Sequence, residues 1–181
     1  MGNKQTKSLT YTAILVAFGI LIPMVMPAKI IIGLASFTLA SHVPIFIAML
    51  ISPPVAVLVA LGTGLGFLLA GFPFIIVMRA LSHLLFALVG AIVIKKRPQI
   101  LDKPVSTFLF ALFINVIHGL TEFVVVLLLT SSANTGAEYV WSLLALIGLG
   151  SIVHGCIDFY LAYAIRKFLI NKVGIDFSIE K

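Results

Sequence analysis

The chain has 181 residues, of which 61% are hydrophobic and 10% are charged, and its formal net charge at pH 7 is +6. This composition excludes a soluble globular domain, in which about 25% of the residues are charged. The positive charge does not indicate nucleic-acid binding, because the Lys and Arg residues stand in short segments beside long apolar stretches, where membrane proteins carry them.

Six apolar stretches take up almost the whole chain, and each is close to the length of about 20 residues that a helix needs to cross a membrane. Prolines mark several of the starts, because the first turn of a helix tolerates a missing N–H. The predicted spans are Leu9–Met26, Phe37–Ile51, Pro54–Ala70, Pro73–Ile94, Val105–Thr130 and Tyr139–Ile170. We therefore predict an all-α integral membrane protein with six transmembrane helices, in a single domain over residues 1–181.

All but two of the twelve Lys and Arg residues fall on one side of the membrane if six spans alternate in direction. The positive-inside rule then places both termini in the cytoplasm of a multi-pass cell-membrane protein. The outer face receives segments 27–36, 71–73 and 131–138. Lys29 lies in the first of them, where it is either a second positive charge above a substrate site or a solvated loop lysine. The ten residues on the inner side are Lys4, Lys7, Lys95, Lys96, Arg97, Lys103, Arg166, Lys167, Lys172 and Lys181.

Ionisable side chains inside a span indicate a protein interior or a water-filled cavity, because each costs about 2.5–3.5 kcal/mol to insert. Arg79 and His83 are four residues apart in the fourth span and therefore share a helix face. Arg79 lies about two helical turns below the outer surface. Its planar guanidinium suits a substrate carboxylate. The alternative is a structural ion pair with Glu122.

A second polar stripe lies in the fifth span, where Asn115, His118 and Glu122 follow at spacings of three and four residues. Glu122 has the same predicted depth as Arg79, and Asn115 lies near the middle of the membrane. The stripe either lines a polar pocket or forms hydrogen bonds between helices that hold the bundle together.

The remaining polar residues of the spans give weaker signals. His154 and Asp158 are four residues apart, which favours a local contact or a packing role over ligand binding, and the role of His42 stays open. The histidines do not gather at metal-ligand spacing, so we predict no metal site. Cys156 is the one cysteine, which excludes an intramolecular disulfide.

Nucleotide-binding and catalytic motifs are missing from the sequence. Without a G-x-x-x-x-G-K-[ST] motif the chain is not an ATPase by itself, and without G-x-S-x-G or H-E-x-x-H no enzyme is predicted. Small residues do recur at a spacing of four, as Ala13 and Ala17 in the first span and as Gly62 and Gly66 in the third. Such pairs allow two helices to approach closely.

The segment Ala13-Ile14-Leu15-Val16-Ala17 and the six-span layout resemble the substrate-binding S components of energy-coupling factor (ECF) vitamin transporters. The resemblance covers the whole chain. The segment from Ser36 to Pro44 is similar to stretches of the pantothenate and niacin members, as is Gly71-Phe72-Pro73 leading to Arg79 and His83. The pantothenate type is the more similar of the two.

The resemblance implies a division of labour. The S component captures a vitamin from outside, with the three outer segments covering the pocket. It then docks through Ala13 and Ala17 on a membrane coupling subunit, which works with two ATPase subunits. ATP is therefore bound by the partners, and the chain needs no cofactor of its own. The candidate substrate-binding residues are Lys29, Phe37, Thr38, Phe72, Arg79, His83, Asn115, His118 and Glu122.

Pantothenate is the favoured vitamin, with niacin or another vitamin or precursor as the alternative. Both leading candidates are carboxylates, which Arg79 or Lys29 suits. Pantothenate also has an amide and two hydroxyls and needs neutral polar partners, which Asn115, His83, Thr38 and His118 can supply. Nicotinate needs an aromatic neighbour for stacking, which Phe37, Phe72 or Phe74 near the outer end can provide. An ion-coupled carrier and an intramembrane enzyme are the competing classes.

Overall fold

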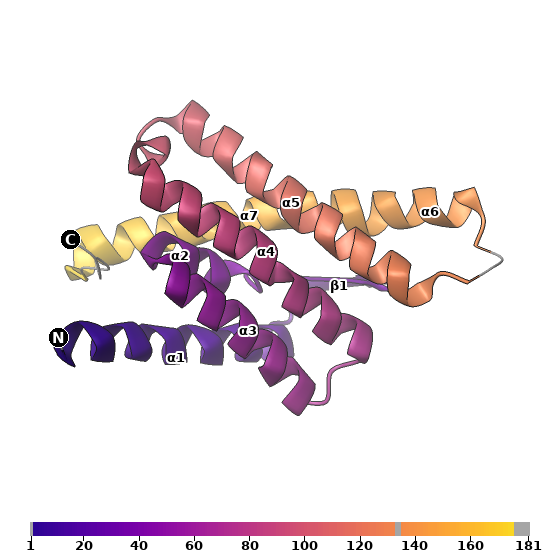
Figure 1. Ribbon diagram of the computed structural model, residues 1–181, viewed down its shortest axis with the longest axis horizontal. Helices are drawn as coiled ribbons and strands as arrows, with labels where there is room; N and C mark the ends of the chain where they lie inside the picture. The colour runs from indigo at the N-terminus through magenta and orange to yellow at the C-terminus, as the bar shows by residue number, and fades with distance from the viewer. Residues whose placement is uncertain (1, 133–134, 176–181) are drawn as a thin grey trace.

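The computed structural model of the protein describes residues 2–132 and 135–175. Residues 133–134 of the predicted outer segment 131–138, and the predicted inner charge Lys181, lie outside this range. The described chain folds into long helices that pack side by side around a short helix and a two-stranded hairpin (Figure 1). The elements are α1 (Gly2–Val25), β1 (Lys29–Ile32), β2 (Ala35–Thr38), α2 (Val43–Ile51), α3 (Pro53–Leu69), α4 (Phe74–Lys96), η1 (Pro98–Leu101), α5 (Pro104–Thr130), α6 (Ala137–Leu143), η2 (Leu144–Leu149), α7 (Gly150–Phe168) and η3 (Leu169–Val173).

Four helical segments of the described chain are long and apolar enough to cross a membrane. They are Gln5–Val25, Phe74–Lys96, Pro104–Thr130 and the continuous stretch Ala137–Val173, which joins α6, η2, α7 and η3. α3 has 17 residues, at the lower limit of about 17–25 for a spanning helix. Five of the six predicted spans therefore correspond to long helical segments, and the protein is a multi-pass membrane protein.

The predicted span Phe37–Ile51 is wrong. Residues 29–38 form an antiparallel hairpin in which Lys29 pairs with Thr38 and Ile32 with Ala35. The helix that follows, α2, has nine residues, which reach about 14 Å and cannot cross a core of about 30 Å. A break follows α2 because Ser52 is extended, at φ −169° and ψ 158°, and leads into the two prolines that start α3.

The short helix α2 lies inside the bundle rather than on its surface. Eight of its nine residues are buried, and it packs against α1, α3, α4 and α7. The ring of Phe46 on α2 lies 5.3 Å from that of Phe86 on α4 and 5.5 Å from that of Phe159 on α7, measured between centroids. These three fully buried rings fix α2 in the core, so its N-terminal end is held at the centre of the protein.

Small residues set the spacing between α1 and α3. A side chain at Gly62 would lie 2.7 Å from the Val16 side chain, and one at Gly66 would overlap Ile20. The predicted close approach at the glycine pair is thereby confirmed. Ala13 and Ala17 are exposed on α1, so the face that carries them is open to a partner.

The two ends of the bundle differ in charge. Both termini and η1 lie at one end, whereas the hairpin and the turns after α3 and α5 lie toward the other (Figure 1). Lys7, Arg97, Lys103 and Lys172 belong to the first end. The charge bias along the sequence is therefore a bias between the two ends of the folded bundle. The segment from β2 through α2 returns the chain from the hairpin to the start of α3, so both termini lie at one end although α2 is not a span.

Candidate functional site

A cavity of about 500 Å³ lies beneath the hairpin, within the range of about 300–1,000 Å³ that small-molecule sites occupy. Its walls come from the hairpin, α3, α4 and α5, and they are mainly apolar with a few polar groups. The polar side chains of the lining are Lys29, Ser36, Thr38, Ser41, His42, Thr63, Arg79, His83 and Glu122.

Six of the nine predicted substrate-binding residues line this cavity, namely Lys29, Thr38, Phe72, Arg79, His83 and Glu122. Phe37 does not, because neighbouring side chains of a strand point to opposite faces and its neighbours Ser36 and Thr38 take the cavity face. The ring of Phe37 instead lies 5.6 Å from the ring of His154.

Asn115 and His118 also fail to line the cavity, because the side of α5 that carries them faces α7. Both are fully buried. The Asn115 amide donates to the carbonyl of Ala111 at 2.9 Å, and its Oδ1 lies 3.4 Å from His118 Nδ1. Gly155 of α7 leaves room for both side chains. Both side chains therefore lie behind the cavity wall.

Arg79 forms a buried ion pair with Glu122. Arg79 Nη2 donates to Glu122 Oε2 at 2.9 Å, and the two side chains are 6% and 2% exposed. Arg79 Nη1 donates to the carbonyl of Leu34 at the hairpin turn, at 3.3 Å. Arg79 Nε, also buried, has no hydrogen-bond partner among the described residues. The predicted pairing with Glu122 is confirmed, and it leaves N–H groups of the guanidinium unused.

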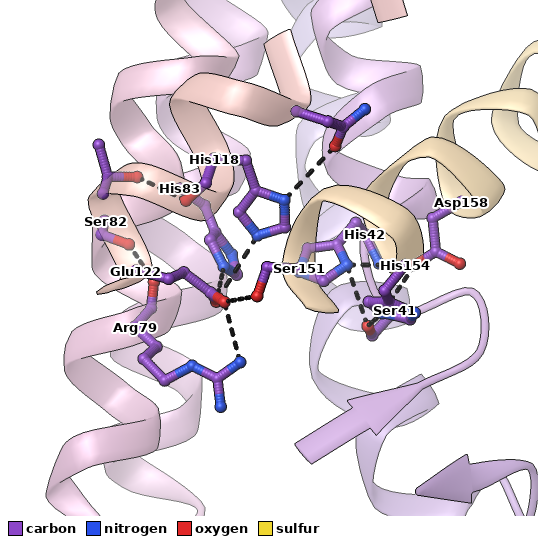
Figure 2. A network of polar contacts seen from close by, with 12 residues as sticks. Ser41, His42, Arg79, Ser82, His83, His118, Glu122, Ser151, His154 and Asp158 are labelled. Carbon is purple, nitrogen blue, oxygen red and sulfur yellow. Dashed lines mark hydrogen bonds and ion pairs between the residues drawn. The ribbon is translucent and has the colours of Figure 1, made fainter. Parts of the chain in front are cut away.

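The two oxygens of Glu122 have different partners. Oε2 accepts from Arg79 and from the hydroxyl of Ser151. Oε1 faces histidines, with His83 Nε2 at 2.9 Å and His118 Nε2 at 3.6 Å. Glu122 thus joins an arginine side and a histidine side of one polar network (Figure 2).

All four histidines of the chain gather in this network, although their positions in the sequence show no metal-ligand spacing. The ring centroid of His42 lies 4.7 Å from that of His83, 4.6 Å from that of His118 and 5.0 Å from that of His154. Each ring comes from a different segment, at the start of α2 or on α4, α5 or α7. Their spacing along the sequence therefore gave no sign of the cluster.

Asp158 holds the start of α2. Its Oδ1 accepts from the backbone N–H of Ala40 at 2.8 Å, and its Oδ2 accepts from that of His42 at 2.9 Å. Ala40 has φ 66°, a left-handed conformation that an alanine rarely adopts. Asp158 Oδ2 also lies 3.1 Å from His42 Nδ1 and 3.4 Å from His154 Nε2, so the predicted contact of His154 with Asp158 is present.

Phe67 and Thr63 are among the residues of the cavity wall that sequence reasoning missed. The ring of Phe67 stacks on that of Phe72 at 4.4 Å between centroids and an angle of 14°. Thr63 is buried, and its hydroxyl has no hydrogen-bond partner among the described residues. Both lie in the apolar helix α3, where one hydroxyl and one more phenylalanine carry no distinct signal.

No family model and no solved structure matches the chain. The chain is 42% identical over 174 residues to the niacin transporter NiaX of Lactococcus lactis subsp. cremoris, and the match covers 95% of this chain and 78% of that protein. The apolar helices and this relative define a membrane transport protein. The chain belongs to the S components of ECF vitamin transporters, the family of that relative.

S components in general work with an ECF transmembrane subunit and ATPase subunits. The class predicted from the sequence is therefore confirmed. The pantothenate type is not supported, because the relative is a niacin transporter. The comparison favours the niacin alternative.

Proposed function

We propose that the chain captures niacin, as the nicotinate anion, in the cavity beneath the hairpin and delivers it across the membrane with ECF partner subunits that bind and hydrolyse ATP. The observation that carries the proposal is the 42% identity to a niacin transporter over 95% of the chain. The cavity supports it with one buried arginine and a pair of stacked phenyl rings.

Arg79 suits the carboxylate of nicotinate. A guanidinium has five N–H donors; in the described chain, one bonds Glu122, one bonds Leu34 and Nε has no partner. A carboxylate that accepts two parallel N–H bonds from such a fork is held more firmly than by a point charge. The ion pair with Glu122 and the contact with substrate are thus compatible roles.

The rest of the lining suits a small aromatic acid better than pantothenate. Phe67 and Phe72 offer ring surface for a pyridine. Thr63 and His83 offer polar groups for its ring nitrogen. Of the polar partners expected for the amide and hydroxyls of pantothenate, Thr38 and His83 line the cavity, whereas Asn115 and His118 do not.

The hairpin and the turn around Phe72 cover the cavity on the side away from the termini. In the proposed orientation this side faces outward, with both termini in the cytoplasm. Two of the three predicted covering segments, 27–36 and 71–73, contribute lining residues. The third, 131–138, contributes none among the residues that the structure describes.

The test of this function is uptake of labelled nicotinate into proteoliposomes that contain the chain with its ECF partner subunits. We expect uptake to require ATP inside the vesicles. It should stop when the ATPase subunits are replaced by variants that bind ATP but do not hydrolyse it. Vesicles with the chain alone under a proton or sodium gradient are the control. Gradient-driven uptake by the chain alone would contradict the proposal and favour an ion-coupled carrier.

A further inference from the structure

Three imidazoles and one carboxylate meet at the inner wall of the cavity, where His42, His83 and Glu122 belong to the lining and His118 lies behind them. His42, His83, His118 and Glu122 each present a ligand atom, and all four atoms lie within 4.8 Å of one another. All four residues are at least nine-tenths buried. We propose that these four side chains bind a divalent transition-metal ion of the zinc class at the floor of the cavity (Figure 2).

The donor set and its spacing suit such an ion. Three nitrogens and one oxygen form a tetrahedral zinc site with bonds of about 2.0–2.1 Å, which places neighbouring ligand atoms about 3.4 Å apart. Glu122 Oε1 lies 2.9 Å from His83 Nε2 and 3.6 Å from His118 Nε2, on either side of that value. Small rotations of the side chains complete the geometry.

Second partners orient two of the three rings, as metal-binding histidines require. His42 Nδ1 lies 3.1 Å from Asp158 Oδ2, and His118 Nδ1 lies 3.4 Å from Asn115 Oδ1. When each Nδ1 donates to its oxygen, each Nε2 keeps a lone pair for the ion. His118 Nε2 is fully buried, yet it has no hydrogen-bond partner among the described residues, which is the sign of a missing ligand.

The charges of the network also favour a cation. Glu122 and Asp158 are two buried carboxylates beside one buried guanidinium, that of Arg79. With neutral histidines the network is one negative charge in excess, and an unbalanced buried charge is costly. A divalent ion leaves one positive charge, which a bound nicotinate anion neutralises. This last point alone rests on the proposed function.

Glu122 is arranged to serve both the arginine and the ion. Oε2 takes the hydrogen bonds from Arg79 and Ser151. Within the described part of the chain, Oε1 contacts only His83 and His118, so it can bind a metal without breaking the ion pair. The second group of possible ligands, His42 with His154 and Asp158, is less suited. There both Asp158 oxygens already accept backbone N–H groups.

The test is metal binding by the purified full chain in detergent, with a non-histidine affinity tag, after treatment with a chelator. Titration with Zn²⁺ should show one ion per chain, and Co²⁺ should give the visible absorption of a tetrahedral site. His83→Ala and His118→Ala should each weaken Zn²⁺ binding at least about tenfold, since even loss of an outer-shell partner costs about 10–100-fold. Asp158→Asn should weaken it by about that outer-shell factor.

His154→Ala is the matched control, because it removes a histidine of the same cluster that is not a proposed ligand. Its Zn²⁺ affinity should stay within about twofold of the parent. Gel filtration and thermal unfolding check the fold of each variant. The Co²⁺ spectrum of the parent protein tests the site independently of the variants, so it remains informative if a variant does not fold. Absence of Zn²⁺ binding in the parent, or its loss in His154→Ala with retention in His118→Ala, would overturn the proposal. Neither result depends on nicotinate.

Discussion

Arg79 shows how one residue serves the fold and the proposed ligand together. Its guanidinium reaches Glu122 on α5 and Leu34 at the hairpin turn, so it joins the wall of the cavity to its cover. Replacement by Ala would also leave Glu122 as a buried, unpaired charge, which costs about 3–5 kcal/mol. A test of the binding role therefore needs variants that leave the net charge of the network unchanged.

We predict that Arg79→Lys, and the double variant Arg79→Ala with Glu122→Gln, fold but bind nicotinate at least about tenfold more weakly, because a charge-assisted hydrogen bond contributes about 1.5–3 kcal/mol. Titration calorimetry in detergent measures the change. Arg97→Ala removes an exposed arginine at the end of α4 and is the matched control. Unchanged nicotinate affinity in the folded double variant would refute the role of Arg79.

Gly155 is the point where α7 comes closest to the polar network. A methyl group there would overlap Asn115 Oδ1 and lie 2.8 Å from His118 Nδ1. We predict that Gly155→Ala destabilises the protein by about 1–3 kcal/mol, the usual cost of overpacking. Thermal unfolding in detergent measures it. Gly136→Ala, where a new methyl group meets nothing within 4 Å, should leave the midpoint unchanged; an equal loss in both would contradict this account.

At the scale of elements, the long helices were predictable and the region between residues 29 and 52 was not. Long apolar stretches and prolines locate α3, α4, α5 and the last helix to within a few residues, whereas α1 begins at Gly2, seven residues before the predicted span. Residues 37–51 are equally apolar, but part of them pairs in the hairpin and part forms the buried helix α2. Apolar composition alone does not separate a lipid-facing helix from a short one enclosed by protein.

The same limit applies to the site. The spacing of Arg79 and His83, and the depth of Glu122, pointed correctly to the cavity wall. Asn115 and His118 lie on the same stripe as Glu122, but α7 covers their part of it. Which part of a helical stripe meets a cavity depends on the neighbouring helix, and one sequence does not show that neighbour.

The hairpin gives a prediction at this scale. Gly33 has φ +55° and nothing lies within 4 Å of a side chain placed there, so Gly33→Val adds backbone strain alone, about 1–2 kcal/mol. β1 is exposed along its whole length, so we expect the strain to open the hairpin locally without unfolding the helices. We therefore predict little change in the unfolding midpoint, but a nicotinate affinity about 5- to 30-fold lower. A fall in the midpoint with unchanged affinity would show that the hairpin supports the fold rather than the ligand.

At the scale of the whole molecule, the proposed docking face of α1 lies apart from the substrate cavity. Ala13 and Ala17 are exposed, and neither belongs to the cavity lining. We predict that Ala13→Trp or Ala17→Trp blocks assembly with the coupling subunit and leaves nicotinate affinity unchanged, as co-purification and calorimetry can measure. Ala145→Trp, at an exposed alanine of η2, should spare both. Loss of binding together with assembly would make α1 a part of the site.

The central claim is that this chain is a niacin-capturing S component, and the most direct test is a calorimetric titration of the purified chain with nicotinate, nicotinamide and pantothenate. The account predicts tight binding of nicotinate at one site. Nicotinamide, which has no negative charge for Arg79, should bind much more weakly, and pantothenate should give no response at the same concentration. Tight binding of pantothenate, or silence with nicotinate, would contradict the account.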